Sequence, residues 1–133
     1  MFDAVIGVKI IIAALLAALI GYEREIYKKS AGLRTHILVC LASCVLMITG
    51  MIYFPTDSAR IIAGIITGMG FIGAGTIIAG ENKIKGITTA ASLWLITIIG
   101  IIIALGAYEI AIVSTLVAFI VLELGRIRKL RKK

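Results

Sequence analysis

Polar and ionisable side chains at the ends of apolar segments are the residues of this chain that could bind a ligand. Glu23 and Arg24 end the first apolar segment, and Arg34 with Thr35 begins the second. Ionisable residues in or near hydrocarbon are costly and usually face a partner or a water-filled path. The candidate polar site comprises Glu23, Arg24, Arg34, Thr35, Arg60, Thr88 and Thr89.

Two interpretations of these residues stay open. In the structural one, Glu23 pairs with Arg24, Arg34 or a loop lysine and fixes helix ends at the membrane interface. In the functional one, the charges line a cavity, and the hydroxyls of Thr88 and Thr89 either cap a helix or bind a ligand. Helix N-termini carry partial positive charge, so a mouth built from two of them suits an anion or carboxylate better than a bare cation.

Glycine recurs through the third apolar segment. The spacing from residue 68 onward is like a dinucleotide-binding fingerprint, but that motif needs a strand before it and a helix after it in a soluble unit. Nucleotide binding is therefore not expected. Glycine lets helix backbones approach closely, or it leaves carbonyls free to line a pore. These packing or pore-lining candidates are Gly64, Gly68, Gly70, Gly73 and Gly75.

The sequence contains no grouping typical of an enzyme. Cys40 and Cys44 lie one helical turn apart, and two thiols alone do not make a metal site. His36 is the single histidine, so neither a zinc centre nor a histidine-based triad can be assembled. We expect no catalytic residue, no metal site and no cofactor.

The elements that must position these residues are membrane-spanning helices. Apolar residues make up 61% of the 133 residues and charged residues only 16%, with a mean hydropathy of +1.13. A soluble domain is closer to roughly 45–50% apolar and about 25% charged. The sequence predicts an all-α integral membrane protein, a bundle of five transmembrane helices in contact with lipid, over about 2–22, 33–53, 59–79, 87–105 and 110–125.

The basic residues predict the orientation of this bundle. The net charge is +7, and 12 of the 14 Lys and Arg residues fall in alternate loops and in the tail after the last span. Only Lys9 and Arg60 fall on the other side. Positive loops face the cytoplasm, so we expect the N-terminus outside and the C-terminus inside a bacterial or archaeal cytoplasmic (inner) membrane. Residues 1–125 then form the transmembrane domain and 126–133 a basic cytoplasmic tail. Because the basic residues flank apolar spans, nucleic acid is not an expected partner.

A weak internal repeat relates the two halves of the bundle. An offset of 54 residues aligns Gly21 with Gly75 and Gly32 with Gly86, as well as Lys29 with Lys83, Leu33 with Ile87 and Thr35 with Thr89. Spans 1–2 and 3–4 would then form a parallel repeat about an axis along the membrane normal. The repeat would place two cytoplasmic loops symmetrically around one mouth.

Several ordered motifs between Leu16 and Gly106 resemble the membrane domain of the MgtC/SapB family. The motifs are Gly21-Tyr22-Glu23-Arg24-Glu25, Gly32-Leu33-Arg34-Thr35, Asp57 with Arg60, Gly68-Met69-Gly70-Phe71-Ile72-Gly73-Ala74-Gly75, and Lys85-Gly86-Ile87-Thr88-Thr89-Ala90-Ala91-Ser92-Leu93-Trp94. The resemblance implies a bacterial inner-membrane protein tied to growth in low magnesium and to virulence. Many family members add a C-terminal cytoplasmic domain, which we expect to be absent after Lys133.

Three functions follow as expectations. The first is a regulator of Mg²⁺ homeostasis, acting through helix contacts as a homodimer or with another membrane protein. Family resemblance suggests the ATP synthase or magnesium uptake pumps as such partners. The second is a small oligomeric Mg²⁺ or H⁺ transporter or channel with its path through the glycine-rich third span. The third is a lipid-binding or lipid-modifying role that uses the basic mouth.

Overall fold

The computed structural model describes residues 4–79 and 83–130, which form five helices and one short hairpin. All five helices are long and apolar enough to cross a membrane, which confirms the predicted helical bundle and makes the chain a multi-pass membrane protein. In chain order the elements are α1 (Ala4–Ile26), α2 (Leu33–Tyr53), α3 (Ser58–Gly75), β1 (Ile78–Ala79), β2 (Ile84–Lys85), α4 (Ile87–Ala104) and α5 (Tyr108–Leu130).

Three helix ends differ from the predicted spans. Helix α1 continues to Ile26, so its terminal charged residues are helical rather than part of the loop. Helix α3 ends at Gly75, where the hydroxyl of Thr76 donates to the Gly73 carbonyl at 2.8 Å, and the chain then enters the hairpin. Helix α5 continues to Leu130 through most of the segment expected as a tail, because that segment is rich in good helix formers and has no proline.

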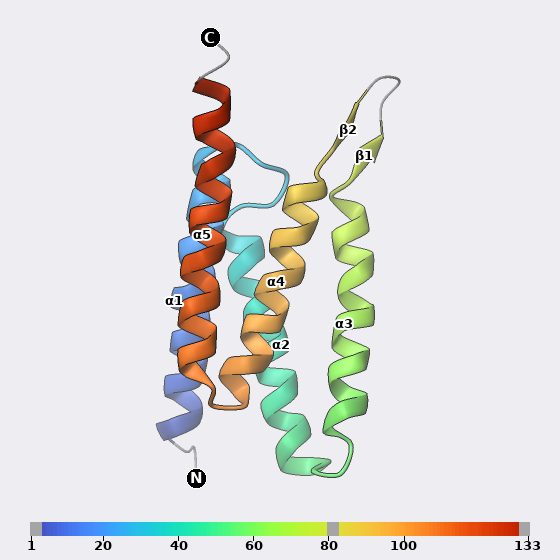
Figure 1. Ribbon diagram of the computed structural model, residues 1–133. Coiled ribbons are helices and arrows are strands. Elements are labelled where there is room, and N and C mark those ends of the chain that lie inside the picture. Colours follow the sequence, from blue (N-terminus) through green and yellow to red (C-terminus); the bar gives the residue numbers. More distant parts are fainter. Residues whose placement is uncertain (1–3, 80–82, 131–133) are drawn as a thin grey trace.

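The helices run side by side, and their connections define two ends of the bundle (Figure 1). One end holds the α1–α2 connection, the β1–β2 hairpin and the last turns of α5, and it is called the basic end here. The opposite end holds the first turn of α1 and the α2–α3 and α4–α5 connections. The basic end is the one that the charge distribution predicts to face the cytoplasm.

The core lies where α4 packs against α1 and α2. Of the most apolar 18-residue window of α4, 56% is buried, compared with 6% for α3 and 11% for α5. A glycine makes the α2–α4 approach close, because a Cβ added at Gly100 would lie 2.4 Å from the Cys40 carbonyl oxygen. The fully buried side chains of this core are Ala13, Ala17, Cys40, Cys44, Met47, Ile96, Ile99, Ile103, Ala104 and Ala111.

One charged side chain in the first span is satisfied by a helix end. The ammonium of Lys9 donates to the carbonyl oxygen of Ala104 at 2.6 Å. Ala104 is the last residue of α4, where unpaired carbonyls carry partial negative charge. The bond joins α1 to α4 at the end of the bundle opposite the basic end.

The glycine-rich helix α3 lies at the periphery of the described chain. A Cβ added at Gly64, Gly68, Gly70 or Gly75 would meet no described atom within 4 Å, and at Gly73 it would only touch Ala90 at 3.8 Å. The glycines therefore do not mediate close helix packing within a single described chain. Their expected roles in an oligomer or a pore stay predictions.

The two halves of the bundle agree in one register. Helix α2 begins at Leu33 and α4 at Ile87, the residues that the 54-residue offset aligns. Gly32 and Gly86 precede them as N-caps, and neither glycine offers a side chain to cap its helix. The connection between α1 and α2 differs from the connection between α3 and α4, because the described part of the latter includes the paired strands β1 and β2. The parallel repeat stays a prediction.

Candidate functional site

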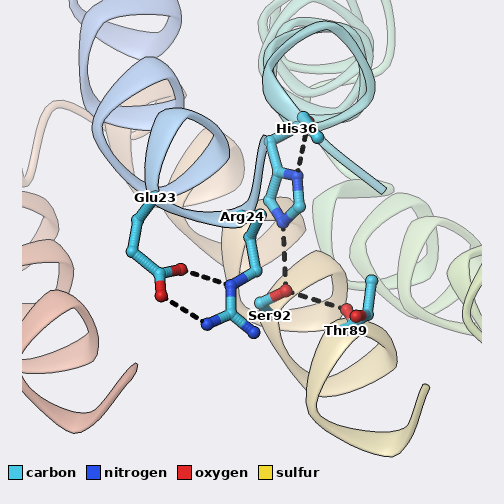
Figure 2. Close-up of polar contacts among 6 residues, drawn as sticks. Glu23, Arg24, His36, Thr89 and Ser92 are labelled. Atoms are coloured by element: carbon cyan, nitrogen blue, oxygen red, sulfur yellow. Dashed lines mark hydrogen bonds and ion pairs between the residues drawn. The ribbon is translucent and has the colours of Figure 1, made fainter. Parts of the chain in front are cut away.

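A buried ion pair closes the basic end of α1. The side chains of Glu23 and Arg24 are only 3% and 4% exposed. Arg24 Nε donates to one carboxylate oxygen of Glu23, and Nη2 donates to the other at 2.6 Å. Both oxygens of Glu23 are therefore engaged, as Figure 2 shows. Charge-assisted bidentate pairing of this kind offsets the cost of holding two charges away from water.

A second polar cluster ties α2 to α4 beside this ion pair. His36 is fully buried, with Nδ1 2.8 Å from the Gly32 carbonyl oxygen and Nε2 3.0 Å from the Ser92 hydroxyl. A carbonyl can only accept, so Nδ1 donates to Gly32. The Ser92 hydroxyl also lies 2.8 Å from the Thr89 carbonyl oxygen, so its single proton is donated either to that carbonyl or to Nε2 (Figure 2). These hydrogen bonds fix the first turn of α4 against α2.

The ion pair and the first turn of α4 line one cavity of about 560 Å³ at the basic end. Four of the predicted site residues line it together: Glu23, Arg24, Thr88 and Thr89. This convergence supports the functional interpretation, although the pairing of Glu23 with Arg24 also matches the structural one. Residues outside the predicted set also line the cavity, including Tyr27, Lys29, Gly86 and Gly125.

Three predicted site residues do not line this cavity. Arg34 is exposed and Thr35 half-buried on the first turn of α2. Arg60 lies at the opposite end of the bundle, at the start of α3, where its guanidinium is 86% exposed and 3.8 Å from the Asp57 carboxylate. The structure does not bring Arg60 together with the other predicted site residues, because α3 begins at the end where α2 terminates.

The local backbone explains why α4 can present its first turn to the cavity. Gly86 precedes α4 with φ at 93°, a left-handed conformation that favours glycine. A Cβ there would also lie 1.8 Å from the carbonyl oxygen of Thr76. With no side-chain cap on α4, the first N–H groups of the helix give this side of the cavity partial positive charge.

The polar groups that line the cavity are mainly hydrogen-bond donors. Among the described residues there is no group of three or more His, Cys, Asp and Glu side chains that could hold a metal ion. The single buried carboxylate of the described chain, Glu23, is committed to Arg24. Helix N–H groups, hydroxyls and the exposed Lys29 are all donors, so the arrangement favours a negatively charged oxygen ligand.

The sequence interpretation did not include four polar residues that lie at the cavity or beside it: Tyr27, Lys29, His36 and Ser92. The single histidine, next to the selected Thr35, was one available signal for the His36 cluster. Ser92 lies three residues after Thr89 and so on the same face of α4. Lys29 entered the sequence interpretation through the charge count, the repeat alignment and the loop lysines considered as partners of Glu23, but not as a site residue.

The fold and the cavity define a multi-pass helical membrane protein with a polar cavity at one end of its bundle. The chain belongs to the MgtC family, whose family model matches residues 10–130. This match confirms the family identified from the sequence motifs. No solved structure matches the chain.

The chain is also similar to named bacterial proteins. It is 39% identical over 125 residues to "Putative magnesium transporter YhiD" of Escherichia coli (strain K12), covering 87% of this chain and 58% of that protein. It is 40% identical over 105 residues to "Protein MgtC" of Salmonella typhimurium (strain LT2), covering 79% and 46%. It is 38% identical over 131 residues to "Protein SapB" of Bacillus subtilis (strain 168), covering 91% and 56%. The chain spans about half the length of the curated relatives it matches.

Proposed function

We propose that this chain is an inner-membrane regulator of Mg²⁺ homeostasis that acts through contacts of α3 with a second copy or another membrane protein. The observation that carries the proposal is the open surface of α3, whose membrane window is only 6% buried. In this proposal the N-terminus lies on the side of the membrane that faces away from the cytoplasm. The protein serves adaptation to low Mg²⁺ and virulence. The ATP synthase and magnesium uptake pumps are the candidate partners that family resemblance suggests.

The described interior of a single chain argues against a route for Mg²⁺ through it. Mg²⁺ dehydrates reluctantly and prefers oxygen ligands, usually one or two carboxylates with retained water. The core between α1, α2 and α4 is instead made of aliphatic and small residues that are 0–6% exposed. Thr97 and Thr115 are buried, but each hydroxyl donates to a carbonyl of its own helix. We infer that the function lies on a surface.

The surface of α3 has features that favour another transmembrane helix. Gly64 and Gly68 are four residues apart on one face of α3, and small residues at that spacing let backbones approach closely in membranes. Both glycines line a groove of about 450 Å³ together with Met69 of α3 and Leu38 and Leu46 of α2. Packing in lipid depends on such close contact, because lipid tails are as apolar as the helices themselves.

Self-association in bilayers tests the proposal. Two differently labelled copies in nanodiscs or liposomes should give resonance energy transfer, and Gly68→Leu should abolish it by filling the groove. Ile112→Leu on the exposed face of α5 is the matched control and should leave the transfer unchanged. In cells that need this protein for growth in low Mg²⁺, Gly68→Leu should lose growth and Ile112→Leu should keep it. Normal growth with Gly68→Leu would refute a regulatory role for this surface.

A second candidate is an oligomeric Mg²⁺ or H⁺ transporter with its path along α3. The name of the Escherichia coli relative, "Putative magnesium transporter YhiD", favours it, as does the backbone that the open glycines leave accessible on α3. Two copies facing each other through these glycines could line a path that one chain lacks. In this case Gly70→Leu should abolish ion flux while oligomers remain.

A further inference from the structure

The polar cavity at the basic end continues into an apolar groove between α4 and α5. This groove has a volume of about 480 Å³ and is lined by side chains such as Ile20, Leu95, Val117 and Val121. Thr88 and Leu122 line both the cavity and the groove. A ligand with a polar head and an apolar tail could therefore occupy both spaces at once.

The cavity and the groove lie along the helices at the depths in the bilayer that the headgroup and an acyl chain of a lipid occupy. Helix α4 has 18 residues, which is about 27 Å of helix and close to the roughly 30 Å of a hydrocarbon core. Its first turn, which lines the cavity, then lies at the level of the lipid headgroups. The groove extends from Leu122 back to Val113 along α5, which is about two and a half turns into the hydrocarbon.

The charges around the cavity select among headgroups. The charges of Glu23 and Arg24 cancel, so the net charge of the cavity lining is +1 and comes from Lys29. The uncapped first turn of α4 adds partial positive charge. A headgroup ammonium would meet in this lining only the Glu23 carboxylate, whose charge is already neutralised by the bidentate pair with Arg24. The cavity thus matches a phosphate diester without an ammonium.

We propose that this cavity and groove form a binding site for one anionic glycerophospholipid of the phosphatidylglycerol type. The phosphate lies between the Lys29 ammonium and the first N–H groups of α4, with the Thr88 hydroxyl as a further donor. One acyl chain lies in the groove between α4 and α5. The site is independent of the α3 surface, so it stands or falls separately from the proposed function.

Lipid retention by the purified full chain tests this site. The protein is exchanged into nanodiscs containing equal amounts of phosphatidylglycerol and phosphatidylethanolamine, extracted into mild detergent, and weighed with its retained lipid by native mass spectrometry. The wild type should retain phosphatidylglycerol in preference. Lys29→Gln should lower that retention about fivefold, the effect of one basic residue near an anionic lipid surface. The neighbouring Lys28→Gln, exposed and outside the cavity lining, should change it much less.

A pair of substitutions on α5 separates the lipid from a free phosphate. Val117→Phe fills the groove and should lower lipid retention. Leu116→Phe changes the preceding residue of α5, which is exposed but outside the groove, and should not lower it. Folding of each variant is checked by its helical circular dichroism and elution volume.

Three results would overturn the proposal. Equal retention of the two lipids by the wild type would show ordinary contact with bulk lipid. Equal losses for the two lysine variants would show a diffuse charge effect. Displacement of the lipid by millimolar inorganic phosphate, with no effect of Val117→Phe, would assign the cavity to the free anion.

Discussion

Substituting Gly100 with alanine should destabilise the bundle, although alanine is the better helix former. The added Cβ would lie 2.1 Å from the Ser43 hydroxyl oxygen and 2.4 Å from the Cys40 carbonyl oxygen. The hydroxyl can rotate away, but the carbonyl belongs to the backbone of α2. Helices α2 and α4 must therefore move apart, in the most buried part of the molecule.

The magnitude follows from two opposing effects. Overpacking a close-packed core costs about 1–3 kcal/mol, and a contact with backbone places Gly100→Ala near the upper part of this range. Replacing glycine by alanine in a helix returns about 1 kcal/mol. We expect Gly100→Ala to lower the free energy of unfolding by about 1–2 kcal/mol. Gly68→Ala meets no described atom within 4 Å, so it should raise the monomer's free energy of unfolding by up to about 1 kcal/mol.

The assay is reversible unfolding in mixed micelles by titration with a denaturing detergent, followed by circular dichroism. The protein is kept dilute, so that dissociation of an oligomer does not contribute to the measured free energy. The opposite signs of the two alanine substitutions make the comparison internally controlled. The packing described for α2 and α4 would be refuted if Gly100→Ala proved as stable as Gly68→Ala.

Three further changes test other contacts. The Glu25 carboxylate accepts a hydrogen bond from the Leu33 N–H at 2.7 Å and so caps α2. Glu25→Ala should lower the free energy of unfolding by about 0.5–2 kcal/mol, and Glu25→Gln should lower it less. Equal losses for the two variants in detergent unfolding would contradict the capping role. Ser92→Ala leaves Nε2 of the buried His36 without its hydroxyl partner. It should lower the free energy of unfolding by about 1–3 kcal/mol, measured by the same detergent titration. Unchanged stability would mean that these hydrogen bonds do not hold α2 and α4 together. Gly86→Ala should reduce stability more than Gly106→Ala, because both have positive φ but only Gly86 would meet a backbone oxygen, and a reversed order in thermal unfolding would contradict this geometry.

Much of the fold follows from the sequence because the bilayer imposes a simple length rule on apolar segments. The turn at Pro55 and the glycines before α2 and α4 punctuate these segments clearly. The convergence of Glu23, Arg24, Thr88 and Thr89 was also predictable, since α1 ends and α4 begins at the same end of an alternating bundle. Arg60 fails the same rule, because a residue at the start of α3 belongs to the other end.

The arrangement of the helices around one another could not be read from the sequence. Helix α3 and helix α4 are both apolar, yet only α4 is buried, because hydropathy does not distinguish a lipid-facing from a protein-facing helix. For the same reason the glycines of α3 predicted close packing that one chain does not provide. The bond between His36 and Ser92 depends on the α2–α4 register across 56 residues, which local patterns do not encode.

Ion flux into liposomes that contain the purified, folded and oriented protein tests the central claim most directly. Mg²⁺ and H⁺ reporters are trapped inside, and protein-free liposomes and the Gly70→Leu variant serve as controls. The regulator account predicts flux no greater than in protein-free liposomes for both the wild type and the variant. Flux by the wild type that Gly70→Leu abolishes would contradict the account and make α3 the wall of a permeation path.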